Sequence, residues 1–236
     1  SYLDEYVNRA LPPLAVDWRT RVALPPIRNQ GACQCCWAFA GTAAIEIWAV
    51  IKGRYAVPDL AEQQLVDCAN AAHGQSSNGC NGGGYPEDVY LYAAKYIIRT
   101  EARWPYLKAD RGWCPQDAGW NSAAEIGSMF FPNYTTSTTP RIYSMVNNNA
   151  SALMTAVNAG PVTATMDGNP LFNYAGGILQ NSSCTFANPL GHSVVVVGYN
   201  ATAGIGSPLS YWIVRNSWGV QWGEGGYFKI QMIEGP

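Results

Sequence analysis

Three cysteines within four positions are the residues of this sequence best suited to covalent chemistry. Cys33, Cys35 and Cys36 directly precede an apolar run, 37–51, that contains one charged residue, Glu46, and no proline. This run predicts a largely buried helix of about four turns, so Cys36 lies at or just before a helix N-terminus. Unpaired N–H groups and the helix dipole stabilise a thiolate there, which makes Cys36 a candidate nucleophile.

Two other interpretations fit these cysteines taken alone. One is a disulfide half beside ordinary buried thiols, and the other is a redox pair of Cys33 and Cys36 in Cys-x-x-Cys spacing. The chain has seven cysteines, so at least one thiol is left over. In a secreted protein such a thiol is either reactive or paired with another molecule.

The two histidines of the chain differ in their surroundings. His73 falls in a Gly-, Ser- and Asn-rich loop, where we expect a solvated side chain. His192 begins a strand of apolar and small residues, and it is either a hydrogen-bonded histidine at a strand end or a general base beside the Cys36 thiol. Such a base needs an acceptor on its other ring nitrogen, and Asn216, which closes a later strand, is the candidate.

The elements that must position these groups divide the chain into two halves. The predicted helices are 37–51, 59–68, 86–99 and 150–159, and the predicted strands are 161–166, 191–199 and 211–216. The N-terminal half is therefore mostly helical and the C-terminal half mostly antiparallel sheet. This is an α+β fold with two subdomains, and sites often form in the cleft between such halves.

Composition narrows the class of protein. The chain has 236 residues, 48% hydrophobic and 13% charged, with a net charge of −2, so nothing directs it to nucleic acid or to an anionic membrane. No apolar run approaches the roughly 18 residues of a membrane span, and the N-terminus lacks a signal-peptide pattern, so we expect any such segment to have been removed. The cysteine content and four glycosylation sequons favour a secretory route. The sequons are at Asn133, Asn149, Asn181 and Asn200.

Several stretches resemble the papain-like cysteine proteases. Gln30–Ala40 is similar to the active-site stretch of that family, and the chain keeps the family order Cys, His, Asn. The further matches, spread from about Leu11 to Ile230, are Val16–Arg19, Glu62–Cys68, Gly79–Gly83, Tyr174–Ile178, Gly191–Val194, Asn216–Gly219 and Trp222–Tyr227.

The resemblance implies a papain-like fold with its active-site cleft between two subdomains. Residues 21–128 would form the mainly helical left subdomain and residues 129–236 the antiparallel β-sheet or barrel of the right one. Residues 1–20 would be an N-terminal extension and a strand packed on the right subdomain.

The resemblance also implies roles for particular residues. Cys36 would be the nucleophile, His192 its partner and general acid/base, and Asn216 the group that orients His192, screened by Trp218. The Gln30 side chain and the Cys36 backbone N–H would form the oxyanion hole.

The implied substrate and disulfide residues are more dispersed. The substrate-binding residues would be Gly82, Gly83, Tyr85, Pro86, Thr165, Leu190, Gly191 and Trp218. The disulfides would be Cys33–Cys80 and Cys68–Cys114.

Three departures from the family pattern stand out. Gln34-Cys35 replaces the usual Gly-Ser, which adds bulk near the site and a second thiol beside the nucleophile. Gly191 replaces the usual Asp or Asn before the histidine. The family partner of Cys184 would lie beyond Pro236, so Cys184 is expected to be free.

The expected function is that of a secreted or lysosomal/vacuolar thiol endopeptidase, made as a zymogen and monomeric. Its partners would be polypeptide substrates, its own propeptide and cystatin-type inhibitors, with no metal, cofactor, nucleic acid or membrane. The alternative is a catalytically weak or silent relative that binds peptides or serves in storage or recognition, against which the complete set of catalytic residue types argues. A redox protein fits less well because Cys33 has a distant partner, and a zinc site lacks a second Cys-x-x-Cys or His-x-His pair.

Overall fold

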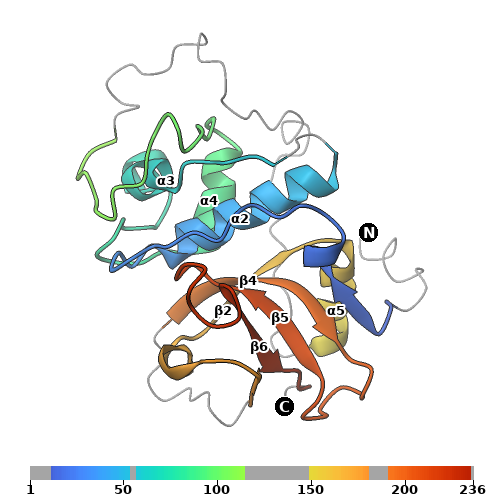
Figure 1. Cartoon of the computed structure of the whole chain (residues 1–236). Coiled ribbons are helices and arrows are strands. Elements are labelled where there is room, and N and C mark those ends of the chain that lie inside the picture. The colour runs from blue at the N-terminus through green and yellow to red at the C-terminus, as the bar shows by residue number, and fades with distance from the viewer. Residues whose placement is uncertain (1–11, 54–56, 115–148, 181–190, 235–236) are drawn as a thin grey trace.

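The computed structural model describes residues 12–53, 57–114, 149–180 and 191–234. Its helices are α2 (Cys36–Ile51), α3 (Glu62–Cys68), α4 (Pro86–Ala93) and α5 (Ala150–Ala159). Its strands are β1 (Ala15–Asp17), β2 (Val162–Asp167), β3 (Ile178–Leu179), β4 (Gly191–Asn200), β5 (Tyr211–Arg215) and β6 (Tyr227–Gln231). The α+β class is confirmed: α2, α3 and α4 lie together above the sheet in Figure 1, and α5 lies beside it. The expected division at residues 128 and 129 falls outside the described ranges.

Strand β4 is the centre of a six-stranded sheet with the order β1-β4-β5-β6-β3, in which β2 also pairs with β4. The pairings are antiparallel except that of β3 with β6, which is parallel. The run Val194–Val197 suits this place because β-branched side chains pack well on a pleated surface. Residues 192–199 are all buried, so β4 is enclosed on both faces and its N-terminal end has a fixed position.

Helix α2 belongs to both hydrophobic cores of the molecule. Small side chains such as Ala40 and Ala43 pack in the core that contains the strands, whereas Trp37 and Phe39 pack in the core of the helical half. Figure 1 shows α2 running between the other helices and the sheet. Because α2 is buried on both sides, the residues at its first turn are held relative to both halves.

The predicted helix at 86–99 is wrong in its C-terminal half, because α4 ends at Ala93. The side chain of Gln64 hydrogen-bonds two backbone groups of the segment after α4, including the Arg99 N–H that a helix through residue 99 would use. Its Nε2 donates to the Ile97 carbonyl at 2.8 Å, and its Oε1 accepts from Arg99 N at 2.7 Å. A tertiary contact therefore replaces the last turns of the helix.

Two disulfides lie in the helical half. Cys33–Cys80 joins the segment before α2 to the glycine-rich loop, and Cys68–Cys114 joins the end of α3 to the segment that follows Trp104. Each closes a loop of more than forty residues, with sequence separations of 47 and 46. In the chain-entropy account each contributes on the order of 4 kcal/mol by restricting the unfolded chain. Cys184 lies outside the described residues.

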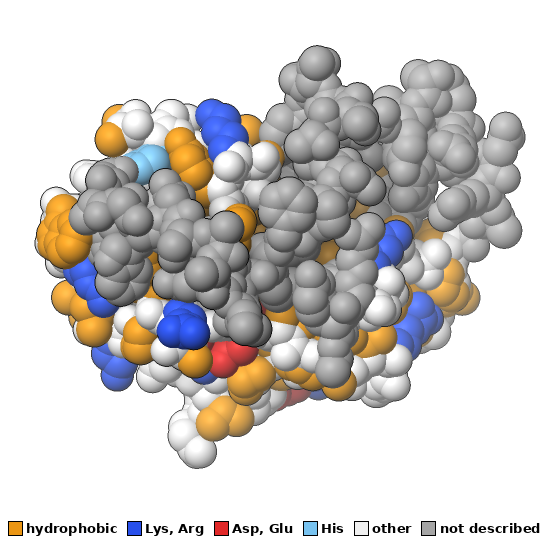
Figure 2. Space-filling model, turned by 90° about the horizontal axis from the view of Figure 1, so that it is seen from above, with side chains coloured by type: hydrophobic (Ala, Val, Ile, Leu, Met, Phe, Trp, Pro, Cys, Tyr) orange, Lys and Arg blue, Asp and Glu red, His pale blue; other side chains and the backbone are white. Residues whose placement is uncertain are grey.

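Within the described ranges, no helix is long and apolar enough to cross a membrane. Figure 2 shows Lys and Arg side chains interspersed with hydrophobic ones on the described part of the face seen from above.

Two carboxylic acids are buried where α2 meets α3. Glu46 on α2 is 3% exposed and accepts a hydrogen bond from Leu60 N at 2.7 Å, and Glu62 at the start of α3 is 2% exposed. Burial raises the pKa of Glu46 to about 8, against the attraction of Arg215. Burial, together with the neighbouring Glu46, also raises the pKa of Glu62. Both side chains are therefore held in the protonated form more strongly than exposed acids.

This burial predicts a pH dependence of stability. A pKa raised on folding stabilises the fold fully below the ordinary value of 4.5, and this contribution is lost as the pH rises through about 8. The urea midpoint of the wild type should therefore fall between about pH 5 and pH 8. Glu46→Gln stays neutral and keeps the Oε1 acceptor for Leu60 N, so its midpoint should fall less over that interval.

The matched control is Glu87→Gln on the exposed side of α4, which should keep the wild-type dependence. Titrating groups that do not interact with Glu46, His192 among them, are common to all three proteins and cancel in the comparison. Glu62 loses a neighbouring charge in Glu46→Gln, and this also makes the midpoint fall less. Parallel curves for Glu46→Gln and the wild type would contradict the assignment.

Candidate active site

Cys36 is the first residue of the 16-residue helix α2 and is half-buried. The preceding residue, Cys35, is the N-cap, and its carbonyl accepts the Ala38 N–H at 2.9 Å and the Phe39 N–H at 3.3 Å. The backbone N–H of Cys36 has no partner within the helix, as is usual for a first turn. Cys36 thus combines a partly accessible thiol with the positive end of a long helix.

Cys35 is a different kind of thiol from its neighbour. It is 0% exposed, and its Sγ lies 3.0 Å from the hydroxyl of Tyr106. Burial raises the pKa of Cys35 to about 12, so the group stays a thiol at neutral pH. Of the two free cysteines among the described residues, Cys36 is the one that can meet an external electrophile.

His192 is held in one tautomer by Asn216. Its Nε2 lies 2.8 Å from Asn216 Oδ1, and the same oxygen accepts the backbone N–H of Ser217 at 2.8 Å. Because an atom that accepts from a backbone N–H must be the amide oxygen, Nε2 carries the hydrogen and donates it. In the neutral imidazole Nδ1 is then unprotonated and can accept a proton.

The hydrogen bond between His192 and Asn216 is enclosed by aromatic rings. The Trp218 ring lies 4.9 Å from the imidazole, and it packs in turn on Trp222 at 5.2 Å and Phe172 at 5.3 Å. Burial lowers the pKa of His192, and the hydrogen bond that His192 donates to Asn216 opposes this effect. The enclosure therefore protects the orientation of the imidazole and favours its neutral form.

The packing of α2 on β4 brings the starts of the two elements together. A cavity of about 10 Å³ lies between them, and its lining includes Phe39 and Ala40 from α2, Ser193 from β4 and Asn216. Cys36 is one turn before Ala40, and His192 directly precedes Ser193. The thiol and the imidazole thus belong to adjoining ends of two packed elements.

Gln30 is held by hydrogen bonds from both sides of the molecule. Its backbone N–H donates to Ser217 O at 2.8 Å, and its Oε1 accepts from Ser217 Oγ at 2.6 Å. Its Nε2 donates to Cys33 O at 2.8 Å, and its carbonyl accepts from Tyr106 OH at 2.8 Å. One hydrogen of Nε2 is left over and can be presented to a ligand.

Ser217 and Tyr106 also belong to this arrangement and were not predicted from the sequence. Ser217 lies inside Asn216–Gly219, one of the stretches that resemble the papain-like proteases, so its position in that stretch could have indicated a role. Tyr106 gave no such indication, because its contact with Gln30 spans 76 positions in the chain.

A pocket of about 240 Å³ lies between the two halves. Among the predicted substrate residues, the structure places five around it, two from the glycine run, one at the N-cap of α4 and two from the sheet. Its lining is Ser76, Gly82, Gly83, Gly84, Tyr85, Thr165, Gly191 and Ser193. Pro86 is buried in the first turn of α4, and Trp218 packs against His192 with the two rings tilted. Leu190 lies outside the described residues.

The remaining predicted residues take other positions. The Asn149 side chain caps α5 by accepting the Ala152 N–H at 2.7 Å. Asn200 ends β4 with its side chain bonded to Thr202. Asn133 and Asn181 lie outside the described ranges. His73 is not fully solvated as expected: it is half-buried, and its ring meets that of Tyr96 edge-on at 5.5 Å.

Comparison with known proteins places this arrangement in context. A cathepsin L-like proteinase of Phaedon cochleariae is 36% identical over 220 residues, covering 92% of this chain and 60% of the relative. The procathepsin L 3 structure from the larval midgut of Tenebrio molitor has a TM-score of 0.73 and 30% identity, covering 95% of this chain and 66% of that one. The Carica candamarcensis cysteine protease CMS1MS2, solved in complex with E-64, has a TM-score of 0.67 and 31% identity, covering 95% and 91%.

The similarity extends over almost all of the chain, although the chain spans only about 60% of the length of the curated relatives that it matches. The sequence model of the papain family cysteine proteases matches residues 12–235. The chain therefore belongs to the papain family of cysteine proteases.

Proposed function

We propose that the protein is a thiol endopeptidase that hydrolyses peptide bonds through an acyl-enzyme on Cys36. The observation that carries this proposal is the hydrogen bond of His192 Nε2 to Asn216 Oδ1, which leaves Nδ1 as the basic nitrogen. A histidine that served only packing would need no fixed tautomer beside a helix that begins with a half-buried cysteine.

The proposed reaction has two half-reactions. His192 Nδ1 takes the Cys36 proton, and the thiolate attacks the scissile carbonyl carbon to form a tetrahedral oxyanion. The imidazolium then gives its proton to the leaving amine as the C–N bond breaks, which leaves a thioester on Cys36. In the second half, His192 takes a proton from water as its oxygen attacks the thioester. The C–S bond then breaks, the acid product forms, and the imidazolium returns the proton to the departing Cys36 sulfur.

The oxyanion needs donors where the charge develops. Two are proposed: the backbone N–H of Cys36, which has no partner within α2, and the remaining N–H of Gln30 Nε2. The hydrogen bond that Ser217 Oγ donates to Gln30 Oε1 supports this role, because it fixes the positions of the oxygen and the NH₂ group of the side-chain amide. Donors fixed in advance need no reorganisation when the oxyanion forms.

The substrate is proposed to lie extended between the halves. Gly82 and Gly83 would hold its backbone, since glycine permits close approach of another chain. The pocket beyond them would take the side chain two residues before the cut. A secreted or lysosomal/vacuolar location, a propeptide and cystatin-type inhibitors are part of the same proposal, as is a monomeric state.

The role of Cys36 is tested against that of the neighbouring thiol. Cys36→Ala should lower the hydrolysis of a fluorogenic peptide by about 10⁴-fold or more, because no other free thiol in the described ranges combines a helix start with a nearby base. Cys35→Ser should stay within about threefold of the wild type, since a hydroxyl can replace its buried donor.

Equal losses in the two variants would contradict this assignment. A wild type that binds peptides in the site without cleaving them would favour the silent, peptide-binding alternative.

The 240 Å³ pocket predicts an apolar preference at the substrate position two before the cut. No charged side chain is among its described lining residues, so a cationic substrate side chain would be buried unpaired. Burying an aliphatic one gains roughly 1.5–3 kcal/mol, or about 10- to 100-fold in kcat/KM. Peptides that differ only at this position should therefore be cleaved faster with Leu than with Arg.

Thr165→Asp provides the matched variant, because it places a carboxylate on the exposed side of the pocket. It should raise the relative kcat/KM for Arg. A wild type that already prefers Arg to Leu would show that an acidic group outside the described lining sets the specificity.

A further inference from the structure

The hydroxyl of Tyr106 lies between two residues of the segment that leads into α2, Gln30 and Cys35. It donates to the Gln30 carbonyl at 2.8 Å, and it lies 3.0 Å from the Cys35 sulfur. Gln30 lies before the cysteine cluster, and Cys35 immediately precedes Cys36. One hydroxyl therefore contacts both ends of the turn that delivers the nucleophile.

The direction of the hydrogen bonds follows from these contacts. Because the Gln30 carbonyl can only accept, the tyrosine O–H points at it, and the Cys35 S–H is left to donate to the phenol oxygen. Burial raises the pKa of Cys35 to about 12 and also raises the pKa of Tyr106, so both hydrogens are present at neutral pH. The result is a chain from thiol to phenol to carbonyl.

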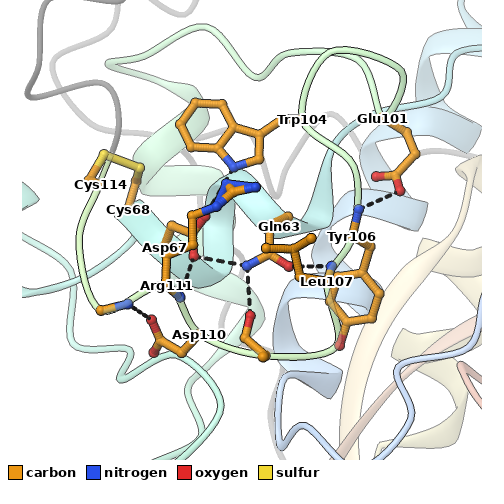
Figure 3. Close-up of polar contacts among 12 residues, drawn as sticks. Gln63, Asp67, Cys68, Glu101, Trp104, Tyr106, Leu107, Asp110, Arg111 and Cys114 are labelled. Carbon is orange, nitrogen blue, oxygen red and sulfur yellow. Dashed lines mark hydrogen bonds and ion pairs between the residues drawn. A yellow bond between two sulfur atoms is a disulfide. The ribbon is translucent and has the colours of Figure 1, made fainter.

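The position of Tyr106 is itself fixed by a polar network (Figure 3). Its backbone N–H donates to Glu101 at 2.8 Å, and the next backbone N–H donates to Gln63 Oε1 at 2.8 Å. Gln63 Nε2 donates to Asp67 Oδ1 at 2.8 Å, and Asp67 also accepts from Trp104 Nε1 at 3.0 Å. The Cys68–Cys114 disulfide closes the same segment onto α3.

The Tyr106 ring adds a packing contact to this frame. It meets Phe39 of α2 edge-to-face with ring centroids 4.9 Å apart. The segment that carries Tyr106 is thus bound to α3 through Gln63 and Asp67 and to α2 through Phe39. A hydroxyl mounted in this way can impose its position on a neighbouring turn.

We propose that Tyr106 is a positioning residue for Gln30, and that the Cys35 thiol supports it as a hydrogen-bond donor. Ser217 Oγ and the Cys33 carbonyl hold the Gln30 side-chain amide, and Tyr106 holds the Gln30 backbone carbonyl, so the residue that carries the amide is anchored to both halves. The inference rests on the proposed function, because the amide matters only if an oxyanion forms beside it. It also gives Cys35 a role that is neither nucleophilic nor redox.

Loss of Gln30 positioning can be distinguished from general destabilisation of the fold by comparing two reactions of Cys36. Amide hydrolysis develops an oxyanion, whereas alkylation of a thiolate by iodoacetamide develops none. A residue that positions Gln30 should therefore affect the first reaction and leave the second unchanged. A residue that only stabilises the fold would affect both reactions through the folded fraction, or neither.

The experiment compares Tyr106→Phe with the wild type in both reactions. The variant keeps the ring against Phe39 and removes the hydroxyl. Its kcat should fall about tenfold with KM changed less than about twofold, since the lost positioning acts in the transition state. The rate of alkylation at Cys36, followed by mass spectrometry, should stay within about twofold of the wild-type rate.

The matched control is Tyr96→Phe, a half-buried tyrosine that packs on His73 and Tyr92 away from this cluster. It should leave both rates as in the wild type. Tyr106→Phe with unchanged kcat, or with alkylation slowed as much as hydrolysis, would overturn the inference. A wild type that is alkylated but cleaves no peptide would instead overturn the proposed function, and this inference with it.

The same assays test the donor role of Cys35. They also test the positioning of Gln30 if Tyr106→Phe fails to fold. Cys35→Ala should lower kcat several-fold and Cys35→Ser should restore most of it, again with alkylation of Cys36 unchanged. In the double variant with Tyr106→Phe, the loss should be smaller than the product of the single losses, because Cys35 acts through the hydroxyl. Independent losses, or an alanine variant as active as the serine one, would contradict the donor role.

Discussion

The packing of α2 between two cores is the constraint on which the rest of this structure depends. One face of the helix lies on the strands and the other on the helical half, so neither half can shift without disturbing it. The residues at its contact with the sheet are small, such as Ala40 and Ala43, which permits a close approach to β4. The two groups proposed to react, Cys36 and His192, stand at the adjoining ends of these two elements. Placement of the chemistry is thus a consequence of core packing rather than of flexible loops.

Several hydrogen bonds around this contact favour fixed orientations of the groups that they join. Asn216 Oδ1 accepts hydrogen bonds from His192 Nε2 and the Ser217 N–H, and Ser217 Oγ donates one to Gln30 Oε1. Arg215 is buried with its guanidinium donating to the Pro25 and Pro26 carbonyls at 2.7 and 2.6 Å. A buried polar group without a partner would cost about 1–3 kcal/mol, so these bonds resist rearrangement. Burial raises the pKa values of Glu46 and Cys35 and so favours their neutral forms, which limits the charge buried in the molecule.

Local sequence signals were enough to predict most of what lies close together in the chain. The apolar run 37–51 predicted α2 within one residue, and the helix at 150–159 is confirmed as α5. The β-branched runs predicted β2, β4 and β5, and the motif resemblance singled out Gln30, His192 and Asn216. These positions could be found because each is marked by its immediate neighbours, either a periodicity or a dense motif.

The features that could not be predicted depend on contacts between distant parts of the chain. The end of α4 is decided by Gln64, and the His73 ring packs on Tyr96 although its loop is polar. The parallel pairing of β3 with β6 has no signal in two short strands. The direction of the Cys35 thiol is also invisible in the sequence, because a second cysteine beside a nucleophile gives no indication of the tyrosine 71 positions away.

The central claim is that a single thiol, placed by α2 against β4, carries the chemistry. The most direct test is labelling of the folded protein with a peptidyl epoxide under saturating conditions, followed by mass spectrometric peptide mapping. One label per chain is expected, located on Cys36, with Cys35 unlabelled. A label on Cys35, or a folded protein that takes up no label, would contradict this claim.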